Sequence, residues 1–116
     1  MRRASVTEDA KGWLAGPWDG SAPIPVGFAT EGVDEPHVHT AITEVYLVAR
    51  GSSLLRVETD TVELTSGDVL ILAPGEAHTF LSSSDDYLHF VVHVPGPEGA
   101  DAGPEKEPVA RSRLAL

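Results

Sequence analysis

The sequence predicts an all-β protein built as a barrel or a two-sheet sandwich, and three observations support this fold class. Short runs of β-branched, aromatic and other apolar residues follow one another from Pro23 to Pro95. Residues that favour turns separate these runs, for example Ser66-Gly67-Asp68 and Pro74-Gly75. No segment repeats apolar residues at helical spacing over three turns, so strands are the expected elements.

The expected strands occupy about 70 residues, a density typical of small barrels and sandwiches. They are predicted at 24–30, 37–39, 44–49, 53–59, 61–64, 69–72, 78–81 and 87–94. The turn segments between them are 31–34, 50–51, residue 60, 66–68, 74–75 and 82–86. Each contains the Gly, Pro, Asp or Ser that a tight reversal of the chain requires.

Three regions are expected along the chain. Residues 1–22 form an N-terminal arm, irregular or with a short strand, whose Trp13 and Trp18 should pack on the barrel or on a partner. Residues 23–95 form the barrel domain. Residues 96–116 form a flexible tail, because the stretch 95–108 is dominated by Pro, Gly and acids and cannot bury a core.

Composition excludes several classes of function. The chain has 116 residues and a formal net charge of −10, so we expect neither nucleic acid nor an anionic membrane as a partner. It has no cysteine, which excludes disulfides, thiolate zinc sites and cysteine nucleophiles. No signal peptide or transmembrane stretch is recognisable, so a cytoplasmic location is expected.

Four residues have the types and spacing of a divalent metal site: His37, His39, Glu44 and His78. Alternate residues of a strand point to the same side, so His37 and His39 present both imidazoles to one point, whereas on a helix they would diverge. Three nitrogen ligands and one oxygen suit a borderline transition metal. The turn at Pro74-Gly75 precedes His78 and can bring it beside the pair.

Two stretches resemble the paired motifs of the cupin superfamily. The first is GVDEPHVHTAITEVYLVARG from Gly32, and the second is GDVLILAPGEAHTFLS from Gly67. The cupin pattern in the first stretch is HxH, then Glu, then Gly, and in the second it is Gly, PxG and His. The sequence departs from the pattern at three points. Four residues, not five, separate Gly32 from His37, and Pro74 directly precedes Gly75 where the family has one residue between Pro and Gly. Ser82 stands where the family has Asn.

The resemblance covers residues 23–95 and implies a small single-domain cupin, a double-stranded β-helix or jelly-roll barrel. It implies one divalent transition metal per chain, with Fe, Mn, Ni, Co, Cu and Zn as candidates, held by the four residues named above. It also implies a small-molecule ligand or substrate. The leading expectation is a metal-dependent oxygenase, in which Glu44 also acts as a base. The hydroxyl of Tyr46, on the same strand face, either contacts substrate or is satisfied in the core.

Alternative functions use the same ligands: a metal-dependent isomerase, cyclase or decarboxylase, or a non-catalytic small-molecule binder. Cupin barrels resemble the ligand-binding domains of some transcription regulators, but the chain has no room for a helix-turn-helix. An enzyme needs open metal positions and a polar group near them, whereas a structural site would be closed.

Two further expectations concern the faces of strands. In 87–94, one face carries Leu88, Phe90, Val92 and Val94 and should point inward, which would send His89 and His93 outward. His89 would then lie at the outer surface or a dimer interface; the alternative is a role behind the metal ligands. Several strands are apolar on both faces, so something should cover the outer one. We expect a homodimer, with cover by the N-terminal arm as the alternative.

Overall fold

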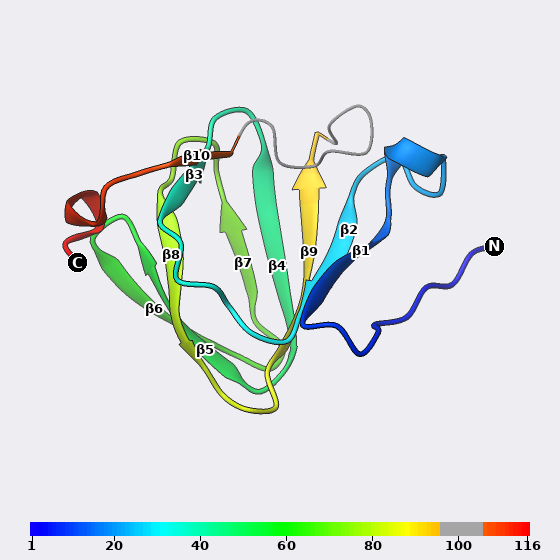
Figure 1. The fold of residues 1–116 in the computed structure, drawn as a ribbon, viewed down its shortest axis with the longest axis horizontal. Coiled ribbons are helices and arrows are strands. Elements are labelled where there is room, and N and C mark those ends of the chain that lie inside the picture. Colours follow the sequence, from blue (N-terminus) through cyan, green and yellow to red (C-terminus); the bar gives the residue numbers. More distant parts are fainter. Residues whose placement is uncertain (96–105) are drawn as a thin grey trace.

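The computed structural model describes residues 1–95 and 106–116, and in them ten strands form two antiparallel five-stranded sheets (Figure 1). The strands are β1 (Lys11–Ala15), β2 (Val26–Ala29), β3 (His37–His39), β4 (Thr43–Arg50), β5 (Ser52–Val57), β6 (Asp60–Thr65), β7 (Val69–Leu72), β8 (His78–Ser83), β9 (Leu88–Val94) and β10 (Lys106–Pro108). Two short 3-10 helices, η1 (Pro17–Asp19) and η2 (Arg111–Leu114), complete the described structure. The eight strands predicted between residues 24 and 94 are confirmed, with ends shifted by a few residues.

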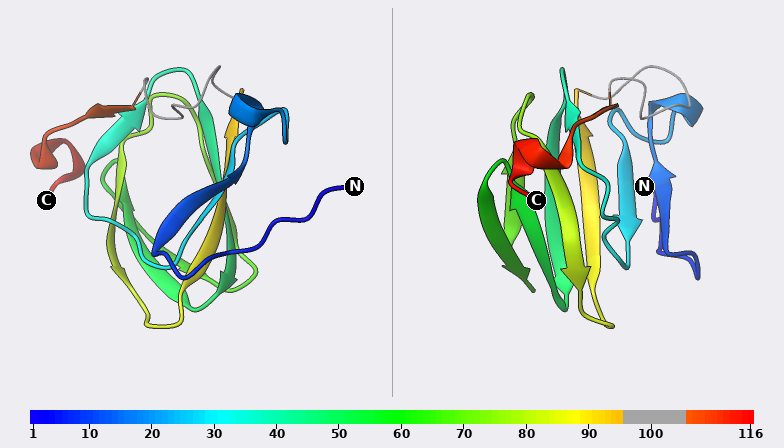
Figure 2. Two further views of the ribbon diagram at one scale, coloured as in Figure 1. Left: turned by 45° about the vertical axis from the view of Figure 1, so that its right-hand side comes forward. Right: turned by 60° about the vertical axis from the view of Figure 1, so that its left-hand side comes forward.

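The two sheets face each other, as the views in Figure 2 show. One has the strand order β1-β2-β9-β4-β7 and the other β10-β3-β8-β5-β6. Strands that are neighbours in sequence therefore often lie in different sheets, which is the jelly-roll arrangement. The predicted all-β jelly-roll fold is confirmed. Among the described residues, no helix is long and apolar enough to cross a lipid bilayer.

The hydrophobic core lies between the sheets, and strand alternation explains its composition. On β4, Tyr46 and Val48 are buried while Leu47 is exposed. They pack with residues of the facing sheet such as Leu55 and Phe80 in one cluster. Glu44, Tyr46 and Val48 alternate along β4 and face inward. Tyr46 and Val48 belong to this core, and Glu44 lies at the other end of the series.

Gly51 allows the chain to pass from one sheet to the other between β4 and β5. Its φ of 73° lies in the left-handed region. A Cβ atom there would lie 2.7 Å from backbone atoms of Tyr87, closer than atoms can approach. Both the conformation and the space therefore require glycine.

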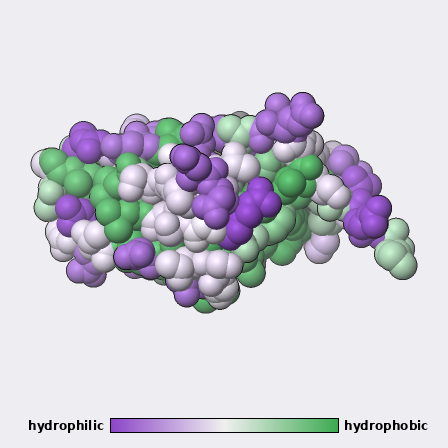
Figure 3. All heavy atoms as spheres, turned by 90° about the horizontal axis from the view of Figure 1, so that it is seen from below, coloured by the Kyte–Doolittle hydropathy of each residue, from purple (hydrophilic) through white to green (hydrophobic). Residues whose placement is uncertain are grey.

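The N-terminal arm joins the barrel through β1, which pairs with β2. The ring of Trp13 contacts Trp18 edge-on, with ring centroids 5.8 Å apart. Trp13 also remains 42% exposed. In Figure 3 the N-terminal end of the chain extends away from the body of the molecule.

The predicted flexible tail differs from expectation at its end. Residues 96–105 lie outside the described residues, but 106–116 are ordered as β10 and η2. β10 pairs with β3, and Leu114 is fully buried against Val38 and Ala77. Arg111 and Arg113 bind Asp34 and Glu58 through hydrogen bonds. Residues 106–116 are therefore held to the barrel by an apolar anchor, Leu114, and by two cations that pair with acids on the barrel.

One outer face of the β9-β4-β7 sheet is apolar. Leu47 is 38% exposed, Val69 54% and Ile71 64%. Pairing aligns Leu47 with Val69 and Val45 with Ile71, so these side chains form one patch on the sheet. We call this set, Val45, Leu47, Val69 and Ile71, the outer patch.

We predict that Leu114→Ala lowers the free energy of unfolding by about 2 to 4 kcal/mol, because the side chain is fully buried against Val38 of β3 and Ala77, the residue before β8. Urea unfolding followed by circular dichroism measures the change. Leu116→Ala is the matched control: this leucine is 38% exposed, and its loss should cost less than about 0.5 kcal/mol. Equal, small effects would show that the C-terminal segment does not anchor the barrel.

Candidate metal centre

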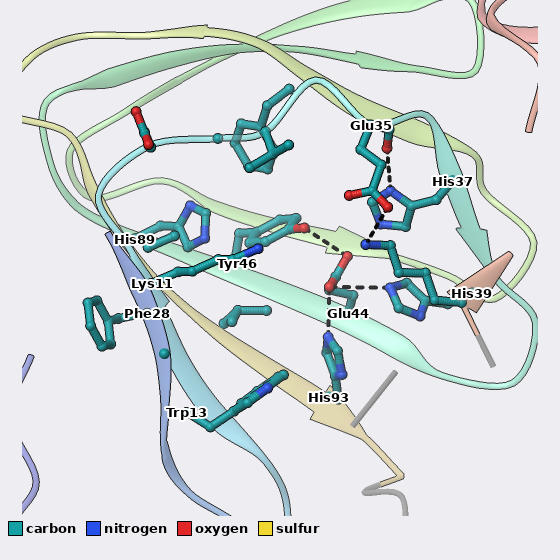
Figure 4. Close-up of a pocket in the computed structure, with 18 residues that line it drawn as sticks. Lys11, Trp13, Phe28, Glu35, His37, His39, Glu44, Tyr46, His89 and His93 are labelled. Carbon is teal, nitrogen blue, oxygen red and sulfur yellow. Dashed lines mark hydrogen bonds and ion pairs between the residues drawn. The ribbon is translucent and has the colours of Figure 1, made fainter. Parts of the chain in front are cut away.

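The site begins with two cross-strand pairs, one in each sheet. In one sheet, His37 on β3 lies opposite His78 on β8, and their ring centroids are 4.4 Å apart. In the facing sheet, Glu44 on β4 lies opposite His93 on β9. His39 lies two residues after His37 and therefore on the same face of β3. The two sheets thus direct four imidazoles and one carboxylate toward the space between them. Figure 4 shows three of these imidazoles, those of His37, His39 and His93, with Glu44.

The carboxylate of Glu44 lies at the centre of this group. Its Oε1 is 3.0 Å from Nε2 of His78 and accepts a hydrogen bond of 2.9 Å from the Tyr46 hydroxyl. Its Oε2 is 2.7 Å from Nε2 of His93 and 3.5 Å from Nε2 of His39. Glu44 itself is 5% exposed, so a carboxylate is held inside the barrel by polar partners on both oxygens.

Electrostatics favour the ionised form of this carboxylate. Burial raises the pKa of Glu44, but hydrogen bonds from His39, His78 and His93 outweigh it and hold the pKa well below its usual value. Burial, followed by the charge of Glu44, raises the pKa of Tyr46 well above its usual value. Tyr46 therefore stays a neutral hydrogen-bond donor to a charged acceptor.

Two imidazoles are oriented by backbone carbonyls. Nδ1 of His37 lies 2.6 Å from the carbonyl of Glu35, and Nδ1 of His78 lies 3.1 Å from that of Glu76. A ring that donates Nδ1–H to a carbonyl keeps Nε2 as a lone pair for a metal. Burial, as the main cause, lowers the pKa of His37 to about 4, so this ring is neutral at physiological pH.

Ligand atoms of these residues are close enough to share an ion. Those of His37, Glu44 and His78 lie within 4.8 Å of one another, and the same holds for His39, Glu44 and His93. The four residues predicted from the sequence are divided between these two groups, which share Glu44: His37 and His78 belong to one, and His39 belongs with His93 to the other. Tyr46 also follows Glu44 into the barrel, as its position on the strand predicts.

The expected orientation of β9 is wrong. His89 and His93 are 3% and 4% exposed and point inward, while Phe90 and Val92 are more accessible. The prediction assumed that the more apolar face fills the barrel, but the interior beside β4 is polar because it contains Glu44. His89 and His93 are four residues apart and therefore share one face of the strand, and this face points inward.

A cavity of about 530 Å³ adjoins the polar cluster. Its inner wall includes His37, His39, Glu44, Tyr46, Phe28, Phe80, His89, Val91 and His93. The exposed residues Lys11, Trp13, Val33 and Lys106 also line it and form its rim. Its size suits a small organic molecule, and its lining combines apolar rings with several ionisable side chains.

Comparisons with known proteins agree with this architecture. Residues 20–111 match the AraC-like ligand-binding domain family. A search of curated proteins found no match.

Solved structures similar to this chain are cupin-type barrels. A Streptomyces PAC13 variant with uridine has a TM-score of 0.66 and 13% identity, over 94% of this chain and 92% of that chain. A cupin protein from Bacteroides fragilis has a TM-score of 0.62 and 24% identity, over 86% and 90%. KdgF from Halomonas sp. has a TM-score of 0.62 and 17% identity, over 83% and 90%. At these identities the likeness shows the fold alone.

The family match spans most of the chain, and the chain has the same fold as these structures. The chain therefore belongs to the AraC-like ligand-binding domain family and is a small cupin.

Proposed function

We propose that this cupin binds one divalent transition metal through His37, His39, Glu44 and His78 and acts as a metal-dependent enzyme on a small organic molecule. The observation that carries the proposal is a buried, ionised carboxylate surrounded by imidazoles at the wall of an open cavity. His93 is a fifth donor at the same carboxylate.

The hydrogen bonds of His78 support a metal at this point. Its Nδ1 faces the carbonyl of Glu76, and its Nε2 faces the carboxylate of Glu44. Both partners are acceptors, whereas a neutral imidazole has one proton to donate. A cation held by Nε2 and the carboxylate would replace the missing proton. Nδ1 of His93 is also buried and has no hydrogen-bond partner in the part of the chain that the structure describes, so the described groups alone leave this cluster incompletely satisfied.

The donor set limits the metals. Imidazole nitrogen and carboxylate oxygen suit Fe(II), Mn(II), Co(II), Ni(II) and Cu(II), and Zn(II) is compatible as well. When bound, such an ion supplies Lewis acidity, and a redox-active one also supplies reactivity toward dioxygen.

Glu44 and Tyr46 are the residues of this chain that we assign to the chemistry. Glu44 supplies a fixed negative charge and is the candidate base for a substrate proton. The hydroxyl of Tyr46 donates a hydrogen bond to Oε1 of Glu44, which holds that oxygen in place. Because Tyr46 also lines the cavity, its ring forms the surface against which a substrate would lie.

We favour an oxygenase-type reaction on an enol, catechol, thiol or 2-oxo compound, since these can offer two donor atoms to a metal. Isomerisation, cyclisation and decarboxylation would use the same residues. One similar structure is described as Pac13, a unique nucleoside dehydratase, which shows that a barrel of this fold also supports elimination chemistry.

A second candidate is a non-catalytic sensor that binds a small molecule in the same cavity. The family match favours it, because the family is described as a ligand-binding domain. The two candidates share the cavity and differ in whether bound substrate is converted.

We also propose a homodimer formed through the outer patch. The patch lies on a sheet face with Val69 and Ile71 more than half exposed. A second copy of the same patch would cover these side chains by a two-fold, self-complementary contact.

For metal binding, we predict that Glu44→Gln weakens Ni²⁺ binding at least about 100-fold, since loss of even an outer-shell partner typically costs 10- to 100-fold. Isothermal titration calorimetry of chelator-stripped protein measures the affinity. Glu31→Gln is the control, because Glu31 lines the same cavity but is outside the donor cluster. Retention of full Ni²⁺ affinity by Glu44→Gln or by His78→Ala would contradict the site.

For catalysis, we predict that Fe²⁺-loaded protein consumes oxygen with at least one member of a panel of enols, catechols, thiols and 2-oxo acids. An oxygen electrode and product analysis provide the readout, with Zn²⁺-loaded protein as the redox-inactive control. Turnover without oxygen uptake would favour the isomerase, cyclase or decarboxylase group. Tight binding without conversion across the panel would favour the sensor.

For assembly, we predict that the wild-type protein has twice the chain mass in light scattering after size exclusion, and that Ile71→Lys is monomeric. The added charge would be buried in the proposed interface without a partner. Thr61→Lys, an exposed change on β6, should leave the dimer intact. A monomeric wild type, or a dimeric Ile71→Lys protein, would overturn the proposed interface.

A further inference from the structure

His89 lies in the wall of the cavity but takes no part in the donor cluster. It is 3% exposed, and its Nδ1 lies 2.7 Å from the hydroxyl of Tyr87, which is itself 1% exposed. Its ring stacks on Phe80, with centroids 5.4 Å apart. These contacts fix the orientation of the ring, and Nε2 is the nitrogen that Tyr87 does not bind.

The bond to Tyr87 fixes the protonation of the ring. Burial raises the pKa of Tyr87 to about 12 and lowers that of His89 to about 4, so both groups are neutral at pH 7. A phenol is the stronger proton donor and an imidazole nitrogen the stronger acceptor, so Tyr87 donates to Nδ1. The single ring proton of His89 is then on Nε2.

That Nε2–H group faces the cavity. Within the described residues, no protein atom forms a hydrogen bond with Nε2 of His89. This nitrogen is also not fully enclosed, so it keeps some accessible surface. It is therefore reached from the open space that His89 lines. Figure 4 shows His89 on the opposite side of Tyr46 from the cluster around Glu44.

Aromatic rings connect these two polar points. The Tyr46 ring lies 4.7 Å from that of His89 by centroid, while its hydroxyl contacts Glu44. Phe28 and Phe80 line the same cavity. The distance from the carboxylate to His89 is thus spanned by one tyrosine side chain, so a ligand containing one ring can reach both ends. Flat apolar walls favour a planar ring between the polar points.

We propose that His89, oriented by Tyr87, is a second binding point of the cavity, which donates a hydrogen bond from Nε2 to an oxygen of a planar, ring-containing ligand whose other end lies at Glu44. The assignment of the near end rests on the proposed metal function. The assignment of His89 rests on its own contacts. Tyr87 is a positioning residue, since it acts on the ligand through His89.

The state of the ring can be tested without any ligand. In metal-free, ¹⁵N-labelled protein, two-dimensional NMR should show His89 as a neutral ring with its proton on Nε2 from pH 6 to pH 8. Tyr87→Phe should give a mixture of the two tautomers while the fold is retained. A proton on Nδ1, or a charged His89 at pH 7, would overturn the proposal.

The binding role is tested with two probes on Ni²⁺-loaded protein. 4-Nitrocatechol has two metal-binding hydroxyls and nitro oxygens at the far side of its ring, whereas catechol has the hydroxyls alone. His89→Phe should weaken 4-nitrocatechol binding about 3- to 10-fold, the loss typical of one neutral hydrogen bond, and change catechol binding less than about 2-fold. His89→Gln, which restores an N–H donor, should recover part of the loss.

The outcomes separate the two proposals. Equal losses for both probes in His89→Phe, or no recovery in His89→Gln, would mean that His89 only fills space, and the inference would fail while the metal centre stands. Absence of binding of either probe to the Ni²⁺-loaded wild type would overturn the proposed function, and the two-ended ligand would fail with it.

Discussion

The buried charge of Glu44 is the constraint on which the rest of the site depends. A carboxylate inside a protein costs several kcal/mol unless opposite charge or hydrogen bonds compensate for it. Here the compensation comes from Tyr46, His39, His78 and His93, which lie on β4, β3, β8 and β9 and therefore on both sheets. Because these partners come from both sheets, the carboxylate of Glu44 can be buried only when the two sheets face each other.

The register of the strands meets this requirement. The pairs His37 with His78 and Glu44 with His93 lie in opposite sheets and converge on one point. β3, which is short and carries two of the imidazoles, is held on its open edge by β10, while Leu114 packs beneath Val38. The C-terminal segment is thus part of what positions the donors, although it is distant from them in sequence.

Much of this arrangement was predictable from the sequence, for physical reasons. Period-two alternation places His37 beside His39 and Tyr46 beside Glu44, and the turn at Pro74-Gly75 leads directly into His78. The inward orientation of His93 was not predictable from hydropathy, because β9 is apolar on the face that points outward. Only the pairing of β9 with β4, a long-range contact, places His93 opposite Glu44. The order of residues 106–116 likewise depends on a tertiary partner for Leu114.

The central claim is that the charge of Glu44 is shared with a metal ion between the sheets. The most direct test is anomalous X-ray diffraction at the nickel edge from crystals of Ni²⁺-loaded protein. We predict one strong anomalous peak within about 2.3 Å of the Glu44 carboxylate and of imidazole nitrogens of His37, His39 and His78. A map without a peak between the sheets, with Glu44 bonded to the imidazoles and Tyr46 alone, would contradict it.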